Sequence, residues 1–98
     1  MPIINRIADF HDDMTVWRRG LHARPETAFE EHDTAEFVAA KLTEFGIKVH
    51  RGLAGTGVVG TLGEGDGPAI GLRADMDALH ITEANDFAHR STHEGKMH

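Results

Sequence analysis

Apolar residues recur at helical spacing along the first part of the chain. The positions that are three or four residues apart form one stripe: Ile3, Ile7, Phe10, Met14, Trp17 and Leu21. Charged residues such as Asp12, Asp13 and Arg18 fall largely away from this stripe. The period predicts an amphipathic helix over residues 3–21. Its apolar stripe has to be buried against another surface.

A proline separates this helix from a second one. Pro25 pushes the preceding residue out of the helical region, so residues 22–28 should form a connection. Apolar residues return at helical spacing over residues 30–45: Ala35, Val38, Leu42 and Phe45. These positions predict a second helix over residues 30–45.

Both ends of the second helix carry recognisable signals. Either Thr27 or Asp33 suits the N-cap, because each is followed three residues later by a glutamate. The choice between them stays open at this point. Gly46 follows the last apolar position and suits the left-handed conformation that ends many helices. The helix should therefore end at Phe45.

The period then changes to that of strands. Residues 47–50 alternate between apolar and polar, and residues 58–62 and 69–75 are short apolar runs bounded by glycine-rich segments. The last two strands are expected to pair across the turn at residues 63–68. The fold class is therefore α/β, with two N-terminal helices packed on a small sheet of about three strands. Residues 1–98 read as a single incomplete domain, with a loop or disordered tail over residues 80–98.

Composition excludes several classes of function. The 98 residues include no cysteine, which removes disulfide and thiolate chemistry, and the net charge of −6 argues against nucleic acid as a partner. No apolar run reaches the ~18 residues of a membrane helix. The first six residues lack the basic start and apolar core of a signal peptide. We expect a cytoplasmic protein with neither a nucleic-acid nor a membrane partner.

Two carboxylates at the end of the third predicted strand are the main candidates for chemistry. Asp75 and Asp77 would point to one face if the strand continues through them. Such a pair can orient a metal ligand or do acid–base work, or it can simply cap the strand and the following turn. Both interpretations stay open. His89, His93 and His98 have spacings that metal ligands use, but no helical period supports them, so surface histidines are the favoured interpretation.

Five segments, in order and well spaced, together resemble a known family. They are residues 17–26 (WRRGLHARPE), 29–35 (FEEHDTA), 55–60 (GTGVVG), 72–79 (LRADMDAL) and 95–98 (GKMH). The pattern resembles the N-terminal part of the hippurate hydrolase and indole-acetyl-amino-acid hydrolase branch of the zinc carboxypeptidase-like amidohydrolases.

The resemblance implies a partial zinc-peptidase-like domain and a hydrolase of N-acyl amino acids that uses divalent metal (zinc, manganese or nickel). It also implies that the metal-binding motif and the general-base glutamate follow beyond His98. His93 and His98 are then only weak candidates as ligands, and this chain alone is expected to hold no metal and to be inactive.

The resemblance also gives roles to the two aspartates. Asp77 matches an aspartate that orients a metal-binding histidine in carboxypeptidase relatives, and Asp75 stands where those relatives have that histidine. His80 departs from the branch, in which proline is common at this position. A non-enzymatic alternative is a self-associating fragment, a dimer or higher oligomer, that pairs through an open sheet edge or through the stripe of residues 3–21. A homo-oligomer is the expected state.

Overall fold

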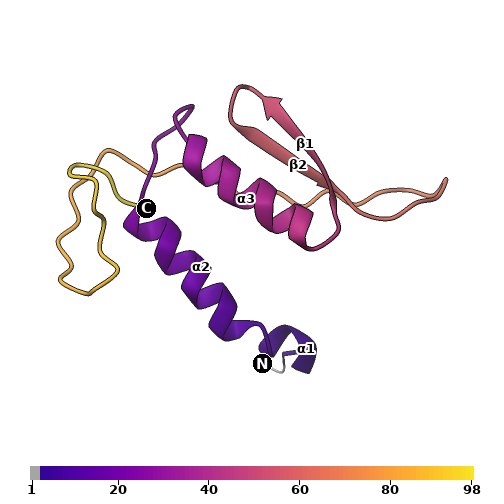
Figure 1. Cartoon of the computed structure of the whole chain (residues 1–98), viewed down its shortest axis with the longest axis horizontal. Helices are drawn as coiled ribbons and strands as arrows, with labels where there is room; N and C mark the ends of the chain where they lie inside the picture. The colour runs from indigo at the N-terminus through magenta and orange to yellow at the C-terminus, as the bar shows by residue number, and fades with distance from the viewer. Residues whose placement is uncertain (1–2) are drawn as a thin grey trace.

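The computed structural model describes residues 3–98. Met1 and Pro2, which are part of the segment examined for a signal peptide in the sequence, lie outside the described residues. The elements follow in the order α1 (Asn5–Ala8), α2 (His11–Ala23), α3 (His32–Glu44), β1 (Lys48–Leu53) and β2 (Gly57–Thr61). Figure 1 shows α3 alongside the hairpin of β1 and β2, with α2 running away from it toward the N-terminus. The predicted α/β class is confirmed.

The single helix predicted over residues 3–21 is wrong in one respect, because it is divided into α1 and α2. The amide of Phe10 bonds to the carbonyl of Ile7, at 3.1 Å, three residues back instead of four. Neither α1 nor α2 receives a side-chain cap at its N-terminus. Ile3, Ile7, Phe10 and Met14 all remain exposed. Because helices in proteins depend mainly on packing of their apolar face, the N-terminal turn has little to hold it in line with α2.

The second predicted helix is confirmed as α3, within two residues at its start and one at its end. Gly46 has φ of 78°, and its amide bonds to the carbonyl of Thr43 at 2.9 Å. The amide of Ile47 bonds to the carbonyl of Leu42 at 3.0 Å. This pair of bonds is the Schellman motif, which satisfies carbonyls that the helix leaves free.

The start of α3 differs from both predicted caps. Neither Thr27 nor Asp33 caps it. The carboxylate of Glu26 accepts the amides of Asp33, at 3.1 Å, and Thr34, at 2.6 Å. Thr27 instead donates its hydroxyl to Glu30, at 3.1 Å. A carboxylate from the preceding connection therefore satisfies two amides at the positive end of the helix dipole.

β1 and β2 form an antiparallel hairpin, in which Lys48 pairs with Thr61 and Leu53 with Gly57. The register shifts between Arg51 and Leu53, where Gly52 has φ of 85°. That geometry is a β-bulge, which needs a residue able to adopt positive φ. The strands predicted over residues 47–50 and 58–62 are thus confirmed with small shifts.

The third strand predicted over residues 69–75 is wrong, and so is its pairing with the second. The segment is extended, but within the described part of the chain residues 63–77 form no backbone–backbone hydrogen bond. Ile70 and Leu72 are 90% and 96% exposed. A strand depends on packing against its neighbours more than on its own residues. Here the chain runs out beyond the end of β2, doubles back and passes α3 without joining the sheet (Figure 1).

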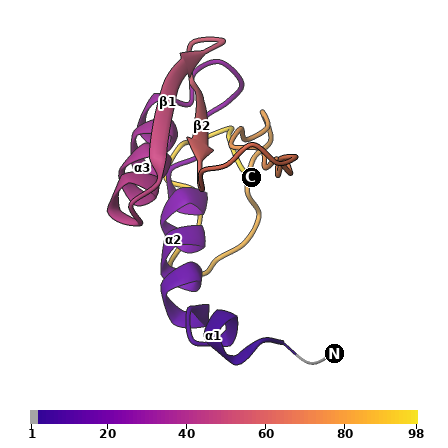
Figure 2. The ribbon, with the colours of Figure 1, turned by 90° about the vertical axis from the view of Figure 1, so that its right-hand side faces the viewer.

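The hairpin covers one side of α3 (Figure 2). The small side chains of Ala35 and Ala39 are buried on α3, and Arg51 of β1 forms an ion pair with Glu36, at 2.8 Å. The indole of Trp17 on α2 packs against Phe45, with ring centroids 5.9 Å apart. The contacts thus join α3 to the sheet on one side and to α2 near its end.

The chain is open rather than closely packed. It exposes 7871 Å², whereas a compact monomer of its mass, 10.7 kDa, exposes about 5,500 Å². Its radius of gyration is 15.6 Å, against about 13 Å for a compact chain of this length. Among residues 3–98, no helix has the length and apolar character needed to cross a membrane.

Candidate functional site

The two predicted site aspartates lie on the extended segment that leads back to the helices. Asp75 is exposed and forms an ion pair with Arg73, at 2.7 Å. Asp77 is half-buried, and the amide of the next residue, Ala78, bonds to the carbonyl of Glu26 at 2.8 Å. Ala78 is also paired with Thr27 in a parallel bridge. Asp77 is therefore anchored close to the residue that caps α3, whereas Asp75 stands in solvent.

The C-terminal residues Met97 and His98 return to the segment that carries Asp75 and Asp77. Leu79 and Met97 form an antiparallel bridge through two backbone bonds, of 2.9 and 3.0 Å. The ring of His98 then donates from Nε2 to the carbonyl of Met76, at 3.2 Å. His98 thus lies next to the segment that carries Asp75 and Asp77.

His93, the other weak candidate for a metal ligand, is held elsewhere. Its Nδ1 donates to the carbonyl of Pro25, at 2.8 Å. His89 stacks on Phe87, with ring centroids 3.9 Å apart and an angle of 8° between the planes. Burial lowers the pKa of His89, and the charge of Arg19 lowers it further. His93 therefore lies apart from the other two, whereas the rings of His89 and His98 both lie near His22, with centroids 6.1 and 6.2 Å from its ring.

The donor groups present do not fit a metal site by themselves. Within the described residues, no three His, Cys, Asp or Glu side chains are placed so that they could hold one ion. A catalytic zinc site takes three protein ligands and an open position. His98 lies near the segment of Asp75 and Asp77 through its bond to Met76, but the three side chains do not form such a set.

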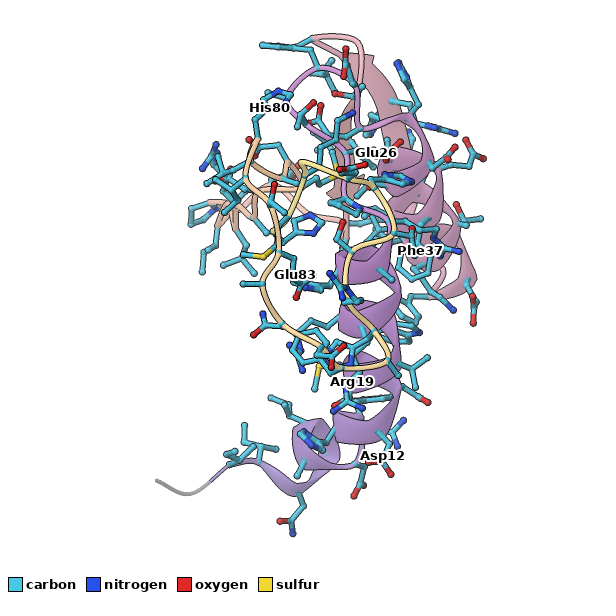
Figure 3. The ribbon with its side chains drawn as sticks, turned by 90° about the vertical axis from the view of Figure 1, so that its left-hand side faces the viewer. Asp12, Arg19, Glu26, Phe37, His80 and Glu83 are labelled. Atoms are coloured by element: carbon cyan, nitrogen blue, oxygen red, sulfur yellow. The ribbon has the colours of Figure 1, made fainter. Side chains whose placement is uncertain are left out.

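A buried carboxylate organises residues 80–98, which form no helix or strand. The side chain of Glu83 is 2% exposed, and both of its oxygens lie 3.0 Å from Nε2 of His22 on α2. It also accepts the amide of Ser91, at 2.6 Å, and the side-chain amide of Asn85, at 3.0 Å. Figure 3 shows Glu83 between this segment and α2. We call Glu83, with His22, Asn85 and Ser91, the Glu83 cluster.

Hydrogen bonding decides the charge of Glu83. Burial acts to raise its pKa, but the bonds from His22, Ser91 and Asn85 outweigh burial and lower the pKa to about 2. An ionised carboxylate can only accept hydrogen bonds, so His22 carries its hydrogen on Nε2. The cluster is therefore a charge-assisted link between α2 and the C-terminal segment.

Further bonds hold the same segment. The amide and the hydroxyl of Thr92 both donate to the carbonyl of Ala23, at 2.8 and 2.7 Å. Ala23 ends α2, where helical carbonyls lack partners within the helix. Residues 91–93 are thus held against the end of α2 and the connection after it.

A groove of about 1000 Å³ opens between the end of α2, α3, β2 and the extended segment that carries Asp75. Its lining includes apolar side chains of α2, α3, β2 and the extended segment: Leu21, Val38, Leu42, Val58 and Leu72. Asp75 and His98 also line it.

Sequence reasoning named Asp75, Asp77 and, as a weak candidate, His98, but it did not name Glu83. His22 lies within the family-like segment 17–26, yet nothing in the spacing connects it with a glutamate 61 positions later. The residues next to Glu83 in the sequence are mostly polar, and they gave no sign that its side chain is buried. Contacts of this kind depend on how distant segments pack.

Comparison with curated proteins identifies the relatives of the chain, although no family model matches it. It is 42% identical over 99 residues to hippurate hydrolase of Campylobacter jejuni, covering 100% of this chain and 26% of that protein. It is 43% identical to an IAA-amino acid hydrolase of Arabidopsis thaliana, covering 92% of this chain and 21% of that protein. An N-acyl-L-amino acid amidohydrolase of Geobacillus stearothermophilus is 40% identical, over 97% of this chain and 26% of that protein.

Over nearly its whole length, the chain is similar to these amidohydrolases. It spans about a fifth to a quarter of the length of these relatives. A solved structure supports the assignment: a dinuclear metal-binding peptidase of the M20 family from Bacillus subtilis matches with a TM-score of 0.84 and 36% identity. That match covers 93% of this chain and 26% of the solved one. The resemblance drawn from the five sequence segments is thus confirmed.

Proposed function

We propose that this chain is part of a metal-dependent amidohydrolase that acts on N-acyl amino acids. The observation that carries the proposal is the 42% identity to hippurate hydrolase over the whole chain. The names of the other relatives agree on hydrolysis of such substrates. We propose zinc, manganese or nickel as the metal, a cytoplasmic location, and no nucleic-acid or membrane partner.

The 98 residues alone are proposed to be inactive. Asp75, Asp77 and His98 do not make up a set of metal ligands, as described above. Without such ligands, the isolated chain should not hydrolyse N-benzoylglycine. Turnover above that of a blank containing only the metal ion would contradict this.

Within the proposed enzyme, Asp77 is a residue that positions the metal site, and Asp75 lies next to that site. Asp77 is half-buried and anchored through Ala78 to the start of α3, which suits a role that needs a fixed side chain. Asp75 is exposed and paired with Arg73, which suits a place at the rim.

A chimera tests both parts of the proposal. Residues 1–98 replace the matching residues of hippurate hydrolase, and release of glycine from N-benzoylglycine is measured together with metal content. The chimera should be active, and Asp77→Asn should lower activity or metal affinity by about 10- to 100-fold. Asp66→Asn, in the exposed turn of residues 63–68, is the matched control and should change neither. An inactive chimera that is folded and loaded with metal would contradict the proposed function.

Exposed apolar side chains favour a second candidate, a self-associating chain. The stripe predicted over residues 3–21 is divided between α1 and α2, but Ile3, Ile7, Phe10 and Met14 along it are all exposed. Two copies packed along this stripe would bury it, as helices do in a coiled coil. Sedimentation at micromolar concentration should then show a dimer that Met14→Lys dissociates. A folded wild-type monomer would count against this candidate.

A further inference from the structure

His22, in the last turn of α2, lies among three other rings. The ring of Phe87 meets it edge-on, with centroids 5.9 Å apart, and the rings of His89 and His98 lie at 6.1 and 6.2 Å. Only 19% of the His22 side chain is exposed. The three neighbouring rings all come from residues 80–98, so His22 is a shared point of contact between α2 and that segment.

Glu83 determines how the His22 ring is oriented. Both carboxylate oxygens lie 3.0 Å from Nε2 of His22, so the N–H of the ring points between them. The carboxylate is itself fixed, because it is buried and accepts bonds from Ser91 and Asn85, at 2.6 and 3.0 Å. The ring torsion of a histidine is broad when nothing holds it. The charge-assisted bond to Glu83 therefore selects one orientation of the His22 ring.

His98 connects this ring to the candidate site. Its own ring lies beside that of His22, with an angle of 36° between the two planes. Nε2 of His98 donates to the carbonyl of Met76, at 3.2 Å. Met76 stands between Asp75 and Asp77 in the sequence. A shift of the His98 ring is thus transmitted to the backbone that carries both candidate site residues.

Other contacts attach residues 80–98 to the rest of the molecule without Glu83. The amide and the hydroxyl of Thr92 donate to the carbonyl of Ala23, at 2.8 and 2.7 Å. Leu79 and Met97 form the bridge at the base of the segment. Loss of the Glu83 carboxylate should therefore leave the segment attached and release the ring to which the carboxylate is bonded.

We infer that Glu83 is a positioning residue of the proposed amidohydrolase, one that acts through His22 and His98 on the backbone of Asp75 and Asp77. Its consequence for catalysis rests on the proposed function. The hydrogen bonds of Glu83 stay within the Glu83 cluster, so its effect on the site passes through the two histidines. Misplacement of a site by about 1 Å can lower a rate on the order of 100-fold, even when its cause lies away from the reacting atoms.

The first test follows the rings in the 98-residue chain. Nuclear Overhauser effects from the ring protons of His98 to the His22 ring and to Met76 are measured at neutral pH. Glu83→Gln keeps the shape of the side chain but leaves one acceptor oxygen for three donors, so both cross-peaks should weaken. Amide exchange of α3 shows whether each variant is folded.

Thr92→Val is the matched control for attachment of the segment. It removes the hydroxyl bond to Ala23 and leaves the amide bond and Glu83 unchanged. Both cross-peaks should keep their wild-type intensity in this variant. A second variant, His22→Phe, removes the donor to Glu83 and should weaken the cross-peak between His98 and Met76. It decides the question if Glu83→Gln does not fold.

The second test measures kcat and KM for N-benzoylglycine in the chimera of residues 1–98 with hippurate hydrolase. Glu83→Gln should lower kcat at least about tenfold and change KM less than about threefold, because the site is misplaced while substrate still binds. Adding Glu83→Gln to His22→Phe should lower kcat no further, because the two residues act as one unit. Thr92→Val should leave both constants unchanged.

The outcomes separate positioning from attachment. Unchanged cross-peaks in a folded Glu83→Gln chain would overturn the inference. Equal weakening in Thr92→Val would also overturn it, because attachment of the segment would then explain the result. An active chimera whose kcat tolerates Glu83→Gln would do the same. A folded wild-type chimera without activity would count against the proposed function alone, and the cross-peaks would still decide whether Glu83 places His98.

Discussion

Removing the carboxylate of Glu26 should destabilise the start of α3. Glu26 accepts the amides of Asp33 and Thr34, at 3.1 and 2.6 Å. Loss of an N-terminal cap costs about 0.5–2 kcal/mol, and bonds to a charged acceptor fall in the upper part of that range. The amide of Asp33 is exposed, so water replaces part of its bond. We expect Glu26→Ala to lower the free energy of unfolding by about 1–2 kcal/mol. Glu26→Gln keeps one acceptor oxygen and should cost about half as much.

The measurement is thermal unfolding followed by circular dichroism at 222 nm and pH 7. A loss of 1 kcal/mol lowers the Tm of a domain of this size by about 4–8 °C. Glu64→Gln is the control, because Glu64 is exposed and lies outside the helices and strands. The control should unfold at the wild-type temperature.

The pH dependence provides a sharper test of the same reasoning. Burial acts to raise the pKa of Glu26, but bonds from Thr34 and Asp33 outweigh it, and the pKa lies below the ordinary value of 4.5. A lowered pKa in the folded state means that the carboxylate stabilises the fold fully above pH 4.5. That contribution is lost as the pH falls through the folded-state pKa. The difference between wild type and Glu26→Gln should therefore shrink in acid. A difference that is absent at pH 7, or that grows as the pH falls, would refute the assignment.

Three further predictions concern the C-terminal segment and the end of α3. Glu83→Gln should speed amide exchange at Ser91 and leave α3 protected, because the link between the C-terminal segment and α2 is weakened. Glu94→Gln is the control: Glu94 is exposed on the same segment, and its substitution should not change exchange at Ser91. Since the pKa of Glu83 is lowered to about 2, protection at Ser91 in the wild type should persist at pH 4 and be lost only near that value. Gly46→Ala should cost about 1 kcal/mol in thermal unfolding, because φ of 78° strains any residue with a Cβ, whereas Gly67→Ala should cost less.

Local sequence signals predicted the elements that local interactions hold. The start and end of α3 were predicted to within two residues of their positions in the structure. The signals that mark them, apolar spacing and Gly46, act over a single turn of the helix. The hairpin strands came from alternation and glycine positions. Two of the wrong predictions needed a packing partner: the N-terminal turn, whose apolar residues stay exposed, and residues 69–75, which have no neighbouring strand within the described residues.

The candidate site was predictable only in part. The acidic pair at Asp75 and Asp77 was visible from spacing, and the family resemblance gave it a role. The approach of His98 to Met76 depends on the bridge between Leu79 and Met97, which no local pattern signals. Burial of Glu83 likewise results from packing between segments far apart in the chain.

The bridge between Leu79 and Met97 makes residues 80–96 a closed loop with a fixed base. Asp77 precedes that base by two residues, and His98 follows it directly. The cost of closing a flexible loop grows slowly, by about 0.6 kcal/mol for each doubling of its length. Residues inserted at the exposed stretch between Glu83 and Ser91 would then lengthen the loop without moving its base. Sequences of different length at this point are thus compatible with one placement of Asp77 and His98.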